Sequence, residues 1–301
     1  MSTTTRAQTT TTTRAWLPLG AAGVTVVLWA SAFVAIRHLK SDFDPGALAF
    51  GRLTIGALCL AVLALRHPMP RPTRRQWLGI VVVGFLWYST YHVALNAGEH
   101  HVDAGTASLL ILTAPVFVAV LAAVFLGERM TVTIGIGLAL ALAGVALIGF
   151  SGNSGGDDQH LLGSGLCLIS ALAAAISMVV QKKVLTGFRA IQLTWLTVTV
   201  GALICLPFAG QFAGNLHHAS GSSIAWLVFL GVGPTAIAYT TYGFALSQMS
   251  ATQAGILTYL IPPITIVLGL LFLGEAPPAL AYLGGVVTLV GVIVARRHPS
   301  K

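Results

Sequence analysis

Two stretches of this chain share one pattern: PVFVAVLAAVFLGE at residues 115–128 and PPITIVLGLLFLGE at residues 262–275. Each begins with proline, continues as an apolar run and ends in Phe-Leu-Gly-Glu, and a shift of 147 residues aligns the two. At the same shift Gly144-Val145 aligns with Gly291-Val292. Because a tetrapeptide and a proline recur in one register, we interpret the two halves of the chain as an internal duplication.

The composition indicates that the apolar runs lie in lipid. Hydrophobic residues make up 56% of the 301 residues, and charged residues make up only 8%. Soluble domains carry roughly 25% charged residues, so this chain has too few to cover a surface in water. The net charge of +8 comes from short basic clusters without a basic stripe or a recognition motif, which argues against a nucleic-acid partner.

The apolar runs have the length of transmembrane helices, since about 20 residues of helix cross the roughly 30 Å hydrocarbon core. They cover residues 17–39, 45–65, 77–97, 104–126, 131–150, 161–181, 190–208, 223–247, 251–273 and 278–295. The segments between them contain proline, glycine and charged residues, as turns do. The sequence therefore predicts an all-α integral membrane protein with ten transmembrane helices.

The duplication divides these helices into two repeats of five, residues 16–150 and residues 161–297. A Thr-rich polar segment, residues 1–15, precedes them and is expected to be a disordered cytoplasmic tail. Because five is an odd number, the second repeat enters the membrane in the opposite orientation to the first. Inverted repeats of this kind place a binding site near the bilayer midplane and allow alternating access, which is typical of transporters.

Lysine and arginine predict the orientation, because cytoplasmic loops are enriched in them. With the N-terminus inside, the cytoplasmic segments hold Arg6, Arg14, Arg66, Arg71, Arg74, Arg75, Arg129, Lys182, Lys183, Arg189, Arg296, Arg297 and Lys301. The opposite side holds only Arg37 and Lys40, and Arg52 lies within a span. We therefore expect both termini in the cytoplasm.

Several motifs resemble those of a known family. They are Trp29-Ala30-Ser31-Ala32-Phe33 in the first span, Pro45 followed by Arg52 in the second, and the two Pro-to-Gly-Glu blocks. Together they resemble the EamA-type members of the drug/metabolite transporter superfamily, over nearly the whole chain after residue 15. The resemblance implies a bacterial inner-membrane exporter with ten helices. The chain length and the aromatic, polar third span are most similar to the amino-acid exporter branch.

Polar and aromatic side chains follow one face of the third span, at helical spacing. They are Tyr88, Tyr91, His92 and Asn96. At the 147-residue shift the eighth span presents Thr235, Tyr239 and Tyr242 on the equivalent face. Such residues can form a belt at headgroup depth, but several lie in mid-span, which favours the wall of a substrate-binding cavity.

Further substrate-binding candidates are Trp29, Trp195 and Tyr259. Trp195 in the seventh span could equally face lipid, and Tyr259 lies one turn before Pro262. We interpret Pro115 and Pro262 as hinges or kinks, because a proline inside a helix frees backbone carbonyls.

Arg52 is the one permanent charge deep in a span, where a charge is costly unless paired. We interpret it as a structural charge that bonds carbonyls or extends toward the interface; binding a substrate carboxylate is the alternative. His92 is the only group inside a span that ionises near neutral pH. No span has Asp or Glu in its interior, so we expect transport by facilitated diffusion or by coupling through His92.

The outer turn Glu99-His100-His101 is expected to be a solvated loop, with weak metal binding as the alternative. Cys59, Cys167 and Cys205 are isolated in apolar runs without ligand or disulfide spacing. We therefore expect no metal site and no cofactor.

The resulting prediction is a secondary transporter that exports small metabolites, with neutral or aromatic amino acids as the favoured substrates. Export of drugs or cationic compounds is the alternative, although no carboxylate in a span is available to neutralise a cation. A membrane-embedded enzyme is disfavoured, because paired aspartates, a serine–histidine site and an HExxH motif are all missing from the spans. The expected partners are a small-molecule substrate and the lipid bilayer, with the protein acting as a monomer.

Overall fold

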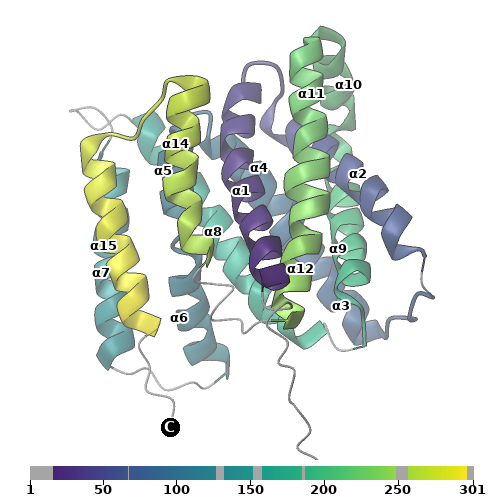
Figure 1. Ribbon diagram of the computed structural model, residues 1–301, viewed down its shortest axis with the longest axis horizontal. Coiled ribbons are helices and arrows are strands. Elements are labelled where there is room, and N and C mark those ends of the chain that lie inside the picture. Colours follow the sequence, from purple (N-terminus) through teal and green to yellow (C-terminus); the bar gives the residue numbers. More distant parts are fainter. Residues whose placement is uncertain are drawn as a thin grey trace, which may run out of the picture.

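The computed structural model describes residues 16–66, 68–126, 132–151, 158–184, 187–248 and 257–296, and the regular elements in these ranges are all helical (Figure 1). The elements of the first half are α1 (Trp16–Leu39), α2 (Pro45–Ala64), α3 (Arg74–Val83), η2 (Gly84–Thr90), α4 (Tyr91–Gly98), α5 (Ala104–Ile111), α6 (Ala114–Leu126) and α7 (Val132–Gly149). Those of the second half are α8 (Asp158–Val184), α9 (Ala190–Ile204), η3 (Leu206–Phe208), α10 (Ala209–His218), α11 (Gly221–Leu230), η4 (Gly231–Ile237), α12 (Ala238–Gln248), η5 (Thr258–Leu260), α14 (Ile261–Leu273) and α15 (Ala279–Arg296). The predicted tail, residues 1–15, lies outside the described residues.

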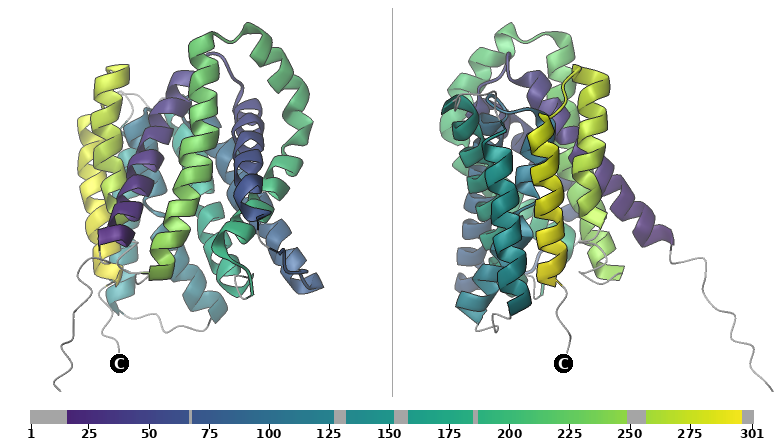
Figure 2. Two further views of the ribbon diagram at one scale, coloured as in Figure 1. Left: turned by 45° about the vertical axis from the view of Figure 1, so that its right-hand side comes forward. Right: turned by 90° about the vertical axis from the view of Figure 1, so that its left-hand side faces the viewer.

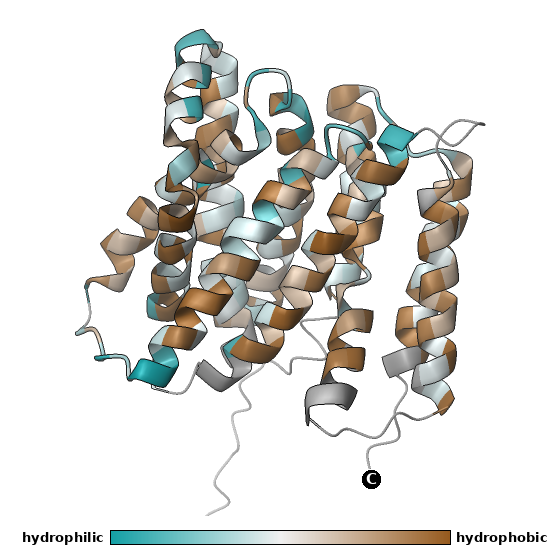
Figure 3. Ribbon diagram, turned by 180° about the vertical axis from the view of Figure 1, so that it is seen from behind, coloured by the Kyte–Doolittle hydropathy of each residue, from teal (hydrophilic) through white to brown (hydrophobic). Residues whose placement is uncertain are grey.

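Several of these helices have the length and composition of membrane spans. Within the described residues, five are long and apolar enough to cross a bilayer, and a sixth span results if α9 and the bent segment after it are counted as one. Four shorter apolar helices lie at 104–118, 135–148, 258–273 and 279–294. Hydrophobic residues cover the middle of the bundle, and hydrophilic ones gather at its two ends (Figure 3). Apolar side chains on the outside of a helical bundle are the expected surface in lipid.

Several predicted spans differ from simple helices. Residues 77–97 were expected to form one helix, but π-helical turns (η2) separate α3 from α4. Residues 190–208 bend by 51° where α9 ends, and Ala209–His218, expected as a loop, is helical. The bend coincides with Pro207 in η3, since a proline has no backbone N–H to continue the helix.

The helix boundaries repeat at the same 147-residue shift as the sequence. α3, η2, α6 and α7 correspond residue for residue to α11, η4, α14 and α15. Even the two π-helical segments, which are rare elements, recur at equivalent positions. The two halves therefore share local backbone structure as well as sequence.

The repeat-related helices α7 and α15 lie side by side (Figure 2). A Cβ added to Gly144 of α7 would come within 2.5 Å of Gly284 O and Thr288 N of α15. The equivalent Gly291 of α15 meets Ala141 N at 2.5 Å and Gly137 O at 2.6 Å. The same contacts are thus made in both directions, with the two helices antiparallel, as across a twofold axis perpendicular to them. Glycine at both positions allows the backbones to approach this closely.

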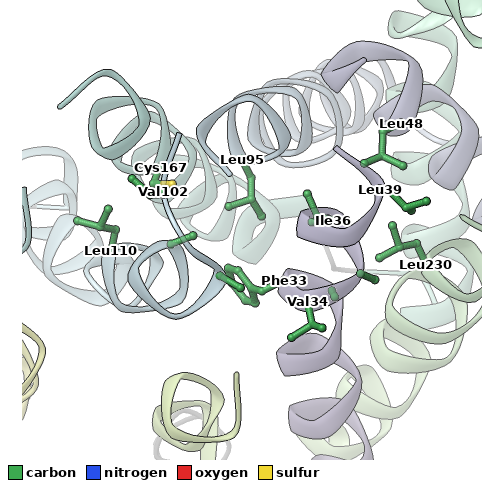
Figure 4. Packing of buried hydrophobic residues seen from close by; sticks show 14 of the residues in the cluster. Phe33, Val34, Ile36, Leu39, Leu48, Leu95, Val102, Leu110, Cys167 and Leu230 are labelled. Atoms are coloured by element: carbon green, nitrogen blue, oxygen red, sulfur yellow. The ribbon is translucent and has the colours of Figure 1, made fainter. Parts of the chain in front are cut away.

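The centre of the bundle is a buried apolar cluster to which many helices contribute (Figure 4). Phe33 and Ile36 of α1, Leu95 of α4 and Leu110 of α5 are buried in it, with Cys167 of α8. α1 therefore packs at the middle of the molecule, next to the eighth and ninth predicted spans.

Candidate substrate-binding site

The π-helical segments lie within the two polar and aromatic faces that were predicted in the third and eighth spans. η2 contains Trp87 and Tyr88, and the Nδ1–H of His92 donates to their carbonyl oxygens at 3.1 and 3.0 Å. In η4 the hydroxyl of Thr235 donates to the Leu230 carbonyl at 2.9 Å. In both spans a side chain of the predicted polar face thus bonds to backbone carbonyls within or next to the π-helical segment.

The rings of the two faces meet. Tyr88 stacks on His92 with ring centroids 6.1 Å apart, and Tyr91 meets His92 edge-on at 5.0 Å. Tyr239 of the eighth span lies edge-on to Tyr88 at 5.4 Å. Edge-to-face and offset arrangements at these separations are the favoured geometries for aromatic rings. The structure thus brings together residues that are about 150 positions apart in the sequence.

Trp29 of α1 completes this aromatic cluster. Its ring lies 5.5 Å from Tyr239 and 5.0 Å from Tyr242. Trp195 of α9 and Tyr239 both pack against the apolar cluster that contains Tyr88. Trp29, Trp195, Tyr239 and Tyr242 are all half-buried, so they retain accessible surface beside the fully packed core.

Other candidates lie apart from the rings. Tyr259 packs with Val116 and residues of α7 and α15, in a separate cluster. Asn96 is buried and donates from Nδ2 to the Pro45 carbonyl at 3.0 Å, which fixes α4 to the start of α2. Pro115 and Pro262 lie in the first turns of α6 and α14, each after an interruption of the preceding helix. Proline fits such a first turn because its missing N–H would have no partner there.

Arg52 of α2 is buried beside the aromatic cluster. Its guanidinium donates from Nη2 to the Thr235 hydroxyl across a long 3.4 Å contact, and Nε has no hydrogen-bond partner among the described residues. Its charge interacts with Tyr239, Tyr91 and Glu99. The alternative of extension toward the interface is not what the structure shows, because Arg52 is only 3% exposed.

The expectation of a solvated Glu99 loop is wrong. Glu99 follows the last residue of α4 and is completely buried, while His100 and His101 are half-buried. This turn packs against neighbouring helices, since Arg37 of α1 donates to the Glu99 carbonyl and Gly98 lies against α8, so a position past the apolar run is still inside the bundle. Glu99 lies just past the third span, so no span has Asp or Glu in its interior, but a carboxylate is nevertheless buried at the end of that span. The spacing His92, Asn96, Glu99 continues the helical face by four and three residues and could have revealed this position.

Arg37 connects three elements at the end of the bundle where Glu99 lies. Its Nε donates to both carboxylate oxygens of Glu275, at 3.1 and 2.8 Å, and Nη1 donates to the Glu99 carbonyl at 2.6 Å. Glu275 follows Gly274, which ends α14 in the left-handed conformation at φ 64°. The ion pair therefore links the end of α1 in the first half to the α14–α15 turn in the second half.

The described residues contain no group of three or more His, Cys, Asp or Glu side chains with the geometry of a metal site. The three cysteines are free thiols. The candidate site therefore consists of aromatic rings, Arg52, Glu99 and hydroxyl groups.

Comparisons with known proteins assign the chain to a class. The sequence model of the EamA-like transporter family matches residues 17–150 and again residues 161–297. A protein of Streptantibioticus cattleyicolor named "Probable terminal-alkyne amino-acid exporter" is 36% identical over 91% of this chain and 92% of its own length. The Bacillus subtilis protein "Uncharacterized transporter YdfC" is 35% identical over 88% of this chain and 86% of its own.

A solved crystal structure also aligns with the fold. Its TM-score is 0.61 at 21% sequence identity, and the alignment covers 94% of this chain and 97% of the other. At this identity the likeness concerns the fold alone.

Proposed function

The chain belongs to the EamA-like transporter family, and on that premise we propose that it exports neutral or aromatic amino acids by alternating access across a bacterial inner membrane. The relatives are transporters in a multi-pass membrane protein family, and one is named as an amino-acid exporter. The observation that carries the proposal for this chain is the meeting of Tyr88, Tyr239 and Trp29 beside buried charged groups. Rings suit an apolar side chain, and the charged groups suit the polar ends of an amino acid.

The proposed architecture is ten spans in two inverted repeats, residues 16–150 and 161–297, with no enzymatic reaction. The five long helices, the bent pair and the four shorter apolar helices together correspond to the ten predicted runs. The two family matches fall on the two repeats. The reciprocal, antiparallel contact of α7 and α15 supports the inversion, because related helices in repeats of the same orientation would run parallel.

The proposed orientation places both termini in the cytoplasm, so that the Arg37–Glu275 pair closes the outer end. In this conformation the pair connects the two halves of the chain. Alternating access requires such contacts to form at one end when the other opens. A charged pair suits that role, since water can replace its hydrogen bonds when the end opens.

A cationic compound is the second candidate substrate. The buried Glu99 supplies the negative group whose absence counted against this alternative, and the rings could add cation–π contacts. Arg52 opposes it, because its fixed positive charge would repel a substrate that carries no anion. We therefore favour a zwitterion.

Transport into liposomes that contain the purified protein tests the proposal. We expect saturable uptake of labelled phenylalanine, above that of protein-free liposomes, which other neutral amino acids reduce and tetraphenylphosphonium does not. Uptake of the labelled cation without uptake of any amino acid would instead establish the second candidate. Transport of neither class would remove the proposed function.

A further inference from the structure

A buried carboxyl group lies at the end of α4 without a hydrogen-bond partner. Both carboxylate oxygens of Glu99 are inaccessible to solvent and accept no hydrogen bond from the described residues. A buried charged group normally has a partner, because its desolvation is costly. The arrangement at Glu99 is therefore suited to a group that arrives from outside the protein.

The guanidinium group of Arg52, which carries the opposite charge, also lacks a full set of hydrogen-bond partners. Arg52 is 3% exposed, its Nε has no partner within the described part of the chain, and its hydrogen bond to the Thr235 hydroxyl is 3.4 Å long. The charges of Arg52 and Glu99 interact, but their side chains form no direct ion pair. Two buried groups of opposite charge thus interact electrostatically and yet form no hydrogen bond or ion pair with each other.

We propose that Glu99 and Arg52 bind the two charged groups of a zwitterionic amino acid: the carboxylate of Glu99 accepts hydrogen bonds from the α-ammonium group, and Arg52 donates to the α-carboxylate. This inference rests on the proposed function and assigns its polar subsite. Tyr91 and Tyr239 connect this subsite with the aromatic cluster, since both interact electrostatically with Arg52 and both make ring contacts in the cluster. The side chain of the substrate would then meet the rings.

The same geometry makes Glu99 a proton carrier. The groups around it are Arg37 of α1, Arg52 of α2, Tyr91 of α4, Asp103 before α5, Cys167 of α8 and Glu275 after α14. Glu99 lies just beyond the span that ends at Gly98. Burial raises the pKa of its carboxyl well above the ordinary value, although the guanidinium groups of Arg37 and Arg52 act in the opposite direction. Without substrate, burial therefore favours the protonated form of the Glu99 carboxyl.

Binding of the ammonium group stabilises the carboxylate, and the proton leaves to water on the side from which substrate entered. After the substrate departs on the other side, Glu99 takes a proton from that side. One proton moves inward for each zwitterion that moves outward, so the exchange carries one positive charge inward. Affinity for the amino acid rises as the pH rises through the pKa of Glu99, because protonation competes with ammonium binding.

The wild-type protein alone gives a first test. In liposomes with a trapped pH indicator, phenylalanine movement should be accompanied by proton movement in the opposite direction. Phenylpropionate, which lacks the amino group, and phenethylamine, which lacks the carboxylate, should each compete about tenfold or more weakly than phenylalanine, the cost of losing one hydrogen bond to a charged group. Equal competition by phenylpropionate, or amino-acid transport without proton movement, would overturn the inference and leave the proposed function standing.

The Glu99→Gln variant locates the effect. It keeps the shape of the side chain and removes the charge, so phenylalanine transport should fall about tenfold or more and its accompanying proton movement should disappear. Asp158→Asn is the matched control, since Asp158 is an exposed acidic residue at the start of α8, and it should behave as wild type. If the Glu99→Gln protein folds but phenylalanine transport and its accompanying proton movement are both unchanged, the inference is contradicted. Should this variant not fold, the wild-type measurements decide. If the wild type transports no amino acid, the proposed function itself has failed.

Discussion

The α7–α15 contact and the aromatic cluster use the internal repeat in opposite ways. At α7 and α15 equivalent residues make equivalent contacts, since Gly144 and Gly291 each lie against the backbone of the other helix in the same way. At the aromatic cluster equivalent positions hold different residues: His92 corresponds to Tyr239, and Leu95 corresponds to Tyr242. Leu95 is buried in the apolar core, whereas Tyr242 is half-buried against Trp29.

The difference shows that the α7–α15 contact supports the fold, whereas the aromatic cluster is suited to binding. A close helix–helix contact depends on backbone approach, so only very small side chains are tolerated and both copies stay alike. A binding site for an asymmetric molecule needs different chemistry on its two sides. Arg52 and Glu99 both come from the first half, while Tyr239 and Tyr242 come from the second.

The largest expected effect comes from breaking the symmetric contact. Gly144→Leu places side-chain atoms where the backbone of α15 lies, and Gly291→Leu does the same at α7. A backbone cannot move aside as a flexible side chain can, and the overpacking cost is about 1–3 kcal/mol or more. We expect both variants to lose most of their monodisperse protein in detergent, measured by size-exclusion chromatography.

Gly135→Leu in α7 is the matched control, because nothing lies within 4 Å of a Cβ at that position and the residue is exposed. It should elute as wild type. A severe loss at only one of Gly144 and Gly291 would show that the two copies of the contact are not equivalent in energy.

A smaller effect is expected at the asymmetric site. Tyr239→Ala removes a ring that touches Trp29, Trp87 and Tyr88. Aromatic contacts contribute about 0.5–1.5 kcal/mol beyond their area, so the apparent KM for phenylalanine should rise about two- to tenfold. The measurement is the concentration dependence of uptake into liposomes.

Phe85→Ala serves as the comparison, since Phe85 lies in the same π-helical segment as Trp87 and Tyr88 but is 51% exposed. It should leave the apparent KM unchanged at matched protein levels. Equal effects of the two variants would indicate that the rings act through stability and not through substrate contact.

A further effect, on stability alone, concerns the turn that carries Glu275. Gly274→Ala puts a Cβ on a residue at φ 64°, which costs about 1–2 kcal/mol in the left-handed region. The midpoint of thermal unfolding in detergent should fall by a few degrees. Gly165→Ala in α8 has open space around it and should instead be neutral or slightly stabilising, by about 0.5–1 kcal/mol. A change of the same sign in both variants would exclude the backbone conformation as the cause.

Sequence patterns predicted most of the helices and much of the aromatic cluster. The positions of α1, α2, α7, α8 and α15 follow directly from apolar runs. The helical spacing of Tyr88, Tyr91 and His92 predicted one face, and the repeat predicted Tyr239 opposite them. Hydropathy does not report backbone geometry, however, so it missed the π-helical turns and the helix Ala209–His218. Tyr259 is a candidate because it lies one turn before Pro262 and not because of any periodicity, and it lies in another cluster.

The sequence by itself determined the membrane class, the duplication and its register, because these depend on composition and on the order of residues along the chain. The tertiary structure alone decided the surroundings of each charge. Arg37 and Glu275 are paired, although 238 positions separate them, and Glu99 is buried, although it follows the apolar run. Whether a polar residue beyond a helix end meets water or protein depends on which other helices pass over it. That depends on packing in three dimensions, on which one-dimensional hydropathy carries no information.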